Sequence, residues 1–290
     1  MKILVTGASG FLGQAVLRRL AKEHRVVGQC HRHGAPGLTA CDLREEGALR
    51  RLLREAGPDV VVHTAAYREP DYCEEHPAEA ERLNVAPARI MAEALPAKAR
   101  LIFISSDYVF NGLQPPYRED ARRVPVNTYG CMKVEAEDLV LAHGGGLVVR
   151  VPVLVGAGPT LAQSGYIGQL VATVRDKTPL VQDHVQVRVP TWIEDVAEAL
   201  AFLITRGARG TMHVAGPRAA TRYESMCDVA RLLGESHAHL TPSMTVVPRR
   251  AARPPNPRLA VDRLRAMGHV CSTDLMEVVR KVVGELPIAD

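Results

Sequence analysis

The sequence predicts an α/β protein, in which a doubly wound parallel sheet is followed by a smaller C-terminal lobe. Short apolar runs rich in β-branched residues alternate with helical patterns through the first half of the chain, which is typical of βαβ units. A glycine-rich turn, Thr6 to Gly13, separates the first such run from the first helical pattern. After Arg150 the alternation gives way to loops rich in proline and glycine. We therefore expect one domain over residues 1–150 and a smaller lobe over 151–290, partly interleaved with the sheet.

Each element follows from its own pattern of apolar residues. Strands are expected in the first half over Ile3–Val5, Arg25–Gly28, Val60–His63, Leu101–Ser105 and Leu147–Val151. Crossover helices are expected between them, as over Glu46–Glu55 and Ala78–Leu95. The second half predicts helices over Ile167–Arg175, Ile193–Ile204 and Tyr223–Leu233, with a strand near Thr211–Val214.

Composition limits the class of protein. The chain has 290 residues, of which 47% are hydrophobic, so it can bury a large core. A net charge of +4 is too small to indicate nucleic-acid binding. No apolar run approaches the ~20 residues of a membrane span, and Met1 leads directly into a core strand, so we expect a cytoplasmic protein. The six cysteines and 11 histidines lack ligand spacing, and no metal site is expected.

The glycine-rich turn is typical of dinucleotide-binding proteins with a Rossmann sheet. Gly7, Gly10 and Gly13 lie between a strand and a helix, which is the context that gives such a motif meaning. Glycine permits the tight turn and lets the backbone approach a pyrophosphate, whose charge faces the helix N-terminus. The first βα unit therefore predicts a nucleotide site.

A second cluster predicts carbonyl chemistry. Tyr129 and Lys133 lie one helical turn apart and share a face, and Ser106 ends a predicted strand, where ligands bind in open α/β sheets. A free phenol has a pKa near ~10, and we expect the Lys133 ammonium to lower it. Tyr129 would protonate a carbonyl oxygen that Ser106 also hydrogen-bonds, while a nicotinamide delivers hydride to the carbon. Asp107, beside Ser106, is expected either to contact substrate or to cap a turn.

These motifs together resemble the extended short-chain dehydrogenase/reductase family, and within it the dTDP-4-dehydrorhamnose reductase-like branch, which includes the regulatory β subunit of methionine adenosyltransferase. The resemblance spans nearly the whole chain and implies catalytic roles for Ser106, Tyr129 and Lys133. It implies cofactor contacts at Gly7, Ser9, Gly10, Phe11, Leu12, Gly13, Asp42, Leu43, Thr64, Ala65, Ala66, Tyr129 and Lys133. It also implies a substrate-binding C-terminal lobe, with substrate contacts at Tyr67, Asp107, Arg188 and Arg253.

The end of the second strand favours NADP, with NAD as the alternative. NAD-preferring chains carry an acidic residue there, whereas this stretch reads Gln29-Cys30-His31-Arg32-His33. No carboxylate would repel a 2′-phosphate, and Arg32, with His33 beside it, could bind one. If Arg32 instead lies on a solvated loop, the protein would accept both nucleotides.

Two function classes follow from the resemblance. We expect reduction of a keto group on a nucleotide-linked deoxysugar, by a chain that could form a homodimer. Arg68–Asp71 and Val151–Leu154, however, look like the regulatory subunit, and sugar reductases usually carry a substrate tryptophan where this chain has Arg150–Leu154. The alternative is therefore a non-catalytic, NADP-binding partner of methionine adenosyltransferase.

Overall fold

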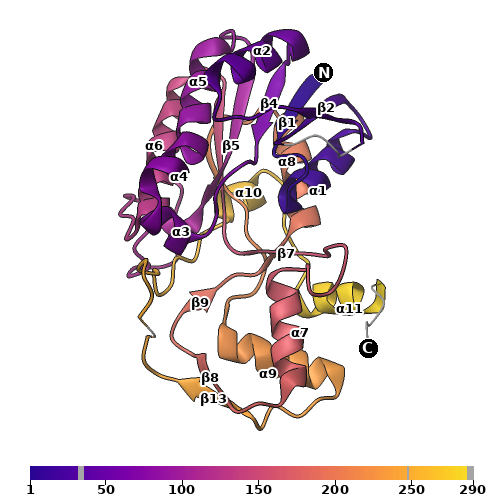
Figure 1. Cartoon of the computed structure of the whole chain (residues 1–290), viewed down its shortest axis with the longest axis vertical. Helices are drawn as coiled ribbons and strands as arrows, with labels where there is room; N and C mark the ends of the chain where they lie inside the picture. The colour runs from indigo at the N-terminus through magenta and orange to yellow at the C-terminus, as the bar shows by residue number, and fades with distance from the viewer. Residues whose placement is uncertain (32–35, 247, 286–290) are drawn as a thin grey trace.

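A seven-stranded sheet forms the centre of the molecule (Figure 1), in a computed structural model that describes residues 1–31, 36–246 and 248–285. Its order is β11-β6-β5-β4-β1-β2-β3, and every pairing is parallel. The strands are β1 (Lys2–Thr6), β2 (Arg25–Cys30), β3 (Leu38–Ala40), β4 (Val60–His63), β5 (Arg100–Ser106), β6 (Gly146–Val151) and β11 (Gly210–His213). The chain winds outward from β1 in both directions, so the expected doubly wound fold is confirmed.

Helices cover both faces of this sheet. On one face α1 (Phe11–Leu20) and α8 (Ile193–Thr205) pack against β1, β4, β5 and β6. On the other face lie α2 (Glu46–Ala56), α5 (Ala86–Ala94) and α6 (Thr128–Ala142). Both layers bury valine, leucine and isoleucine from alternate positions of the strands, as a parallel sheet with two covered faces requires.

Two parts of this region differ from the sequence prediction. The single helix expected over Ala78–Leu95 is two helices, α4 (Pro77–Asn84) and α5, because Pro87 supplies no amide and the backbone turns at Val85, with φ −123°. The short helix α3 (Pro70–Glu75) and strand β3 were not expected; β3 has only three residues, none of them buried.

A smaller lobe lies at the other end of the molecule (Figure 1). Its core lies among α7 (Tyr166–Asp176), α9 (Arg222–Leu233) and α11 (Leu275–Glu285), beside the pair β8 (Leu180–Asp183) and β13 (Leu240–Ser243). Short elements complete the chain: η1 (Asp107–Val109), β7 (Leu154–Val155), β9 (Val187–Arg188), β10 (Thr191–Trp192), β12 (Ala220–Thr221) and α10 (Asp262–Ala266). Since α8 and β11 rejoin the sheet between α7 and α9, lobe and sheet are interleaved in sequence. The boundary at residue 150 stays a prediction.

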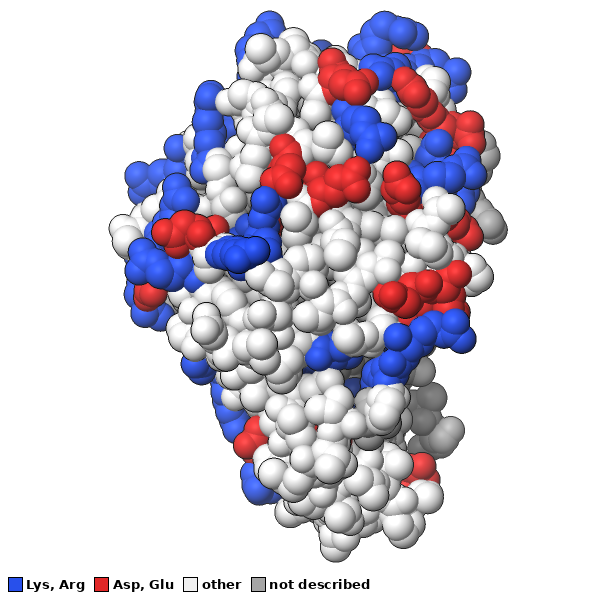
Figure 2. Space-filling model, turned by 90° about the vertical axis from the view of Figure 1, so that its left-hand side faces the viewer, with Lys and Arg blue, Asp and Glu red and all other residues white. Residues whose placement is uncertain are grey.

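The charged groups are mixed rather than segregated. On the face shown in Figure 2, Lys and Arg are interspersed with Asp and Glu over the upper part, and the lower part is mostly uncharged. Within the described residues, no helix combines the length and apolarity needed to cross a bilayer. Over the same ranges, no three His, Cys, Asp or Glu side chains are arranged to hold a metal ion.

Candidate active site

The turn after β1 is shaped by its three glycines. Gly7 has φ +70°, a left-handed conformation that favours glycine, and its carbonyl accepts a 2.9 Å bond from the Gly10 amide. A Cβ on Gly13 would stand 2.1 Å from the Gly7 oxygen, so α1 can approach the turn only with glycine at that position. Gly10, the N-cap of α1, offers no side-chain acceptor to the first-turn amides. Those amides and the positive end of the helix dipole suit a pyrophosphate.

The other predicted turn residues surround these amides. Ser9 is exposed, and its carbonyl accepts a 2.8 Å bond from the Gln14 side chain. Phe11 is half-buried at the start of α1, whereas the Leu12 side chain lies in the core. Of these three, only Ser9 and Phe11 have accessible side chains, and the cofactor roles of all three stay predictions.

The chain leaving β4 forms the opposite wall. The Thr64 hydroxyl donates to the Thr6 carbonyl at 2.7 Å, and the Ala65 amide nitrogen would lie 2.8 Å from a Cβ on Gly7. Thr64 and Ala65 therefore pass directly by the glycine turn, with Ala66 next in the chain, and cofactor contacts by all three stay predictions. The backbone of Tyr67 is fixed by Asn84, a buried residue that accepts from its amide at 2.8 Å and donates to its carbonyl at 2.9 Å.

A buried glutamine joins the glycine turn to the end of β3. The Gly7 amide donates to Gln29 Oε1 at 2.9 Å, and Gln29 Nε2 donates to the Cys41 carbonyl at 2.5 Å. Gln29 is 1% exposed, and both the oxygen and the nitrogen of its side-chain amide are hydrogen-bonded within the protein. In the sequence alone, Gln29 matters only because it is not the acid that NAD-preferring chains carry near this position. Its place at the end of β2, facing the glycine turn, is the signal that could have identified the bridge between the turn and β3.

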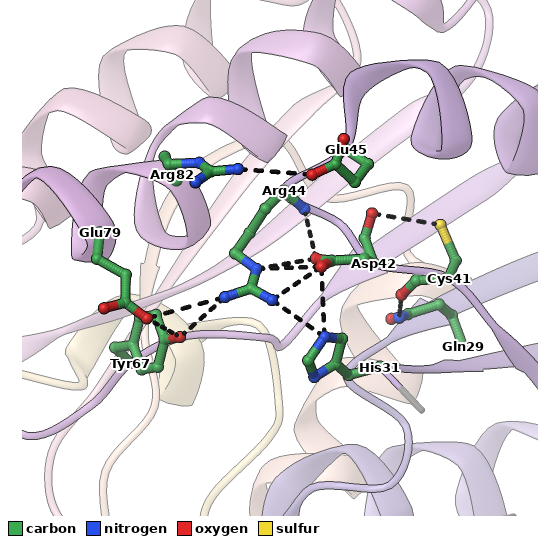
Figure 3. Close-up of polar contacts among 9 residues, drawn as sticks. All are labelled: Gln29, His31, Cys41, Asp42, Arg44, Glu45, Tyr67, Glu79 and Arg82. Carbon is green, nitrogen blue, oxygen red and sulfur yellow. Dashed lines mark hydrogen bonds and ion pairs between the residues drawn. The ribbon is translucent and has the colours of Figure 1, made fainter. Parts of the chain in front are cut away.

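Asp42, whose approach to the adenine stays a prediction, binds Arg44 (Figure 3). Arg44 Nε donates to Asp42 Oδ1 at 3.0 Å and Nη2 to Oδ2 at 2.8 Å. The guanidinium lies 3.2 Å from His31 Nε2 and 3.4 Å from the Tyr67 hydroxyl. Hydrogen bonds from Arg44 hold the pKa of Asp42 far below its usual range, so the carboxylate stays charged.

Three predicted residues of this region need separate mention. Arg32 and His33 lie outside the described residues. The Leu43 side chain is 3% exposed and belongs to the core under α2, so an adenine contact there stays a prediction. Tyr67, predicted to meet substrate, directs its hydroxyl to Glu79 at 3.0 Å and accepts from Arg44, which turns it toward the β3 end of the sheet.

Ser106, Tyr129 and Lys133 converge at the end of β5. Asn127 caps α6 by accepting from the Gly130 amide at 2.8 Å, which sets Tyr129 in the first helical turn. Lys133 Nζ lies 5.7 Å from the Tyr129 ring centroid and donates to the Ile104 carbonyl at 3.0 Å. All three predicted residues are buried, with exposed fractions of 8%, 9% and 3% in chain order, so solvent screens their electrostatic interactions only weakly.

Burial, rather than the neighbouring ammonium, dominates the titration of this site. It raises the pKa of Tyr129, and a hydrogen bond with Ser106 acts in the opposite direction. It lowers the pKa of Lys133 to about 8, against the attraction of Glu137. The prediction of a lowered pKa for the phenol is wrong for the chain alone, because burial raises it and this effect dominates. Tyr129 therefore keeps its proton near neutral pH, as a proton donor must.

Asp107 orients the Ser106 hydroxyl. Ser106 Oγ donates to Asp107 Oδ1 at 2.9 Å and accepts from the Tyr108 amide at 3.2 Å. Burial raises the pKa of Asp107 to about 6, although the positive charge of Arg188 lowers it. Both expectations for Asp107 remain compatible with this placement, since it begins the turn η1 and also lies beside Ser106.

The two arginines predicted to bind substrate are engaged with the protein. Arg188 lies 5.8 Å from the Tyr108 ring and donates to the Pro254 carbonyl at 3.0 Å. Arg253 donates to Asp71 at 2.9 Å, which ties the returning C-terminal segment to α3. Arg188 faces the Asp107 side of the site, while Arg253 is held by an acid; substrate contacts by both stay predictions.

Beneath the site lies a buried ion network that sequence reasoning missed. Glu137, one turn after Lys133 on α6, accepts from Arg150 at 2.7 and 2.8 Å and from Ser105 at 2.5 Å. Glu137 is fully buried and the Arg150 side chain is 3% exposed. The network fixes α6 to β5 and β6, the elements that carry the converging side chains.

Comparisons with known proteins give one family. A model described as the RmlD substrate binding domain matches residues 1–287. Methionine adenosyltransferase 2 subunit beta of Bos taurus is 36% identical over 275 residues, which cover 92% of this chain and 82% of that protein. A probable dTDP-4,6-dihydroxy-2-methyloxan-3-one 4-ketoreductase of Streptomyces antibioticus is 32% identical over 301 residues, covering 100% of this chain and 97% of that protein.

Solved structures give the same fold. A dTDP-4-dehydrorhamnose reductase from Clostridium acetobutylicum has a TM-score of 0.86 and 27% identity, covering 98% of this chain and 99% of that one. The enzyme of that name from Bacillus anthracis, solved in complex with NADP, also has a TM-score of 0.86, with 24% identity, covering 98% of this chain and 100% of that one; this likeness concerns the fold.

Proposed function

The chain belongs to the RmlD substrate binding domain family, within the extended short-chain dehydrogenases/reductases, and from that premise we propose that it is an NADP-dependent reductase of keto groups on nucleotide-linked deoxysugars. The resemblance predicted from the motifs is thereby confirmed. The observation that carries the proposal is the convergence of Ser106, Tyr129 and Lys133 at the end of β5, two strands from the glycine turn in the sheet.

The chain's own residues suit a nicotinamide dinucleotide. The glycine turn offers first-turn amides without a side-chain cap, and Gly13 lets α1 approach the turn closely, because a Cβ there would stand 2.1 Å from the Gly7 oxygen. The β4 exit at Thr64 and Ala65 forms the facing wall. When bound, the nicotinamide supplies the hydride that the carbonyl carbon receives. NADP is the proposed form, with NAD as the alternative, because the end of β2 carries Gln29 and His31 rather than an acid.

The proton comes from Tyr129. Its raised pKa keeps the phenol protonated at neutral pH, so the Oη proton is available for the oxygen of the carbonyl being reduced. Lys133, one turn away, provides positive charge near the phenolate that remains. The Ser106 proton, held by Asp107, can turn to the same carbonyl oxygen and stabilise its developing charge.

The substrate class follows from the relatives. The Streptomyces antibioticus relative is named a ketoreductase of a dTDP-linked sugar, and the Clostridium acetobutylicum structure a dTDP-4-dehydrorhamnose reductase. A small nucleotide-sugar substrate, rather than nucleic acid or membrane, also fits the mixed surface charge in Figure 2. We propose a cytoplasmic enzyme that could act as a homodimer.

Turnover tests this proposal. NADPH absorbance is followed with a panel of dTDP-linked 4-keto-6-deoxy sugars, and oxidation by the wild-type chain above the rate of a Ser106→Ala variant is expected. The absence of turnover across the panel would refute the reductase assignment.

A second function is favoured by a specific observation, the 36% identity to the β subunit of methionine adenosyltransferase 2. In this alternative the chain binds NADP and modulates a methionine adenosyltransferase without turnover. Co-purification with that enzyme and a change in its kinetics would support it, and no association at micromolar concentration would exclude it.

A further inference from the structure

Arg44 lies where three strand-end segments meet (Figure 3). It follows β3 and precedes α2, and its guanidinium contacts His31 after β2, Asp42 after β3 and Tyr67 after β4. The carboxyl ends of these strands form the edge at which ligands of doubly wound sheets bind. A cation is therefore held over the half of the edge that is farthest from Tyr129.

The guanidinium is fixed in place by the protein. Two parallel bonds to Asp42, of 3.0 and 2.8 Å, use the fork geometry that arginine provides, and the Arg44 amide donates to the same carboxylate at 3.0 Å. Because the side chain is ordered by the protein, an anion that binds it costs little additional ordering. Of the other hydrogen-bond contacts of the guanidinium, the one to His31 is 3.2 Å long and the one to the Tyr67 hydroxyl is 3.4 Å long, and the longer one can yield to a stronger acceptor.

This cation is close to the nucleotide site. Gln29 bonds the Gly7 amide at one end and the Cys41 carbonyl at the other, so a single side chain separates the glycine turn from Asp42. His31, at the position where an acid would hold ribose hydroxyls, is instead 3.2 Å from Arg44.

The pairing of Arg44 with Asp42 also engages a carboxylate that, if unpaired, would favour NAD. An unpaired carboxylate at this edge would accept hydrogen bonds from ribose hydroxyls and repel a phosphate. Here both oxygens of Asp42 face Arg44, and a second acid, Glu79, is farther from the guanidinium at 3.8 Å. Since Arg44 engages the Asp42 carboxylate and brings its guanidinium to His31, just after β2, we infer that Arg44 binds the 2′-phosphate of NADP and sets the preference for NADP over NAD.

This inference rests on the proposed cofactor but can be tested without turnover. Binding of 2′,5′-ADP and of 5′-AMP to the full chain is measured by isothermal titration calorimetry, for wild type and for Arg44→Gln, Arg44→Lys and Arg82→Gln. Arg82 is the matched control, because it is a nearby arginine on α4 that is 61% exposed and pairs with Glu45.

Arg44→Gln should weaken 2′,5′-ADP binding by about 10- to 100-fold, the range of a charge-assisted hydrogen bond, and leave 5′-AMP binding unchanged. Arg44→Lys, which keeps the charge without the fork, should lose less, and Arg82→Gln should match wild type. Equal losses for both mononucleotides, or selectivity lost only in an Arg32→Gln variant, would overturn the assignment of Arg44. If wild type binds neither mononucleotide, the cofactor proposal fails together with it. If selectivity depends on Arg44 but no keto sugar is reduced, Arg44 keeps its role and only the reductase proposal falls.

Discussion

Replacing Glu137 by glutamine should lower the free energy of unfolding by about 3–5 kcal/mol, the cost of removing one partner of a buried ion pair. The carboxylate is fully buried and accepts four bonds: two from Arg150, one from Ser105 and one of 3.1 Å from Arg123. Glutamine has the same shape, but it leaves the Arg150 charge without a counterion and turns an N–H group toward existing donors. The loss is therefore electrostatic rather than a cavity effect.

The assay is urea denaturation at neutral pH, followed by far-UV circular dichroism, with Glu135→Gln as the matched control. Glu135 lies on the same helix and pairs with Arg89 at 3.1 Å, but its side chain is 51% exposed, so its loss should be under about 1 kcal/mol. A Glu137→Gln variant that unfolds within about 1 kcal/mol of wild type would refute the reasoning that this network secures α6 to the sheet.

Three further variants test the site, and a fourth serves as a control on α2. Gly13→Ala puts a Cβ 2.1 Å from the Gly7 oxygen, so it should abolish NADPH binding in calorimetry. The control Gly47→Ala meets open space on α2 and should stabilise the fold by about 0.5–1 kcal/mol in urea denaturation. Normal NADPH binding by Gly13→Ala would contradict the close packing of α1 on the glycine turn. Asp107→Asn should be more stable than wild type by about 3 kcal/mol above pH 6. Burial raises the folded pKa of Asp107 to about 6, so the stability of wild type falls as the pH rises from about 4 to 6. If urea titrations show no growth of the variant's advantage between pH 4.5 and 7.5, the buried carboxylate does not carry this cost. Lys133→Met should be more stable than wild type by about 1–2 kcal/mol at pH 7, since burial lowers the folded pKa of Lys133 to about 8. This advantage should shrink from pH 8 to 10.5, as Lys133 loses its charge in wild type. A variant less stable than wild type at pH 7 would show that the buried ammonium carries no such cost.

Much of the sheet could be predicted because buried parallel strands are continuous apolar runs. Val60–His63 is observed with the predicted bounds, and the other four strands of the first half differ by at most two residues at an end. Strand β3 escaped prediction because three partly exposed residues carry no such signal. The break at Val85 depends on the backbone before Pro87, which apolar spacing does not report.

The candidate site also has parts that the sequence could predict and parts that it could not. Tyr129 and Lys133 could be paired from helical spacing, and Ser106 could be placed with them because it ends a strand. Arg44 could not be identified, since its partners come from three segments far apart in the chain. The direction of the Tyr129 pKa was wrong because burial depends on packing that the sequence does not specify.

Isotope transfer tests the central claim most directly. NADPH with both hydrogens at nicotinamide C4 replaced by deuterium is incubated with a dTDP-linked 4-keto-6-deoxy sugar and wild type, Tyr129→Phe or Tyr223→Phe, the last being a tyrosine in the lobe beside His184. Wild type and Tyr223→Phe should place deuterium on the former carbonyl carbon, and Tyr129→Phe should do so about 10²–10⁴-fold more slowly. Unlabelled sugar from wild type, or equal rates for all three chains, would contradict hydride transfer assisted by Tyr129.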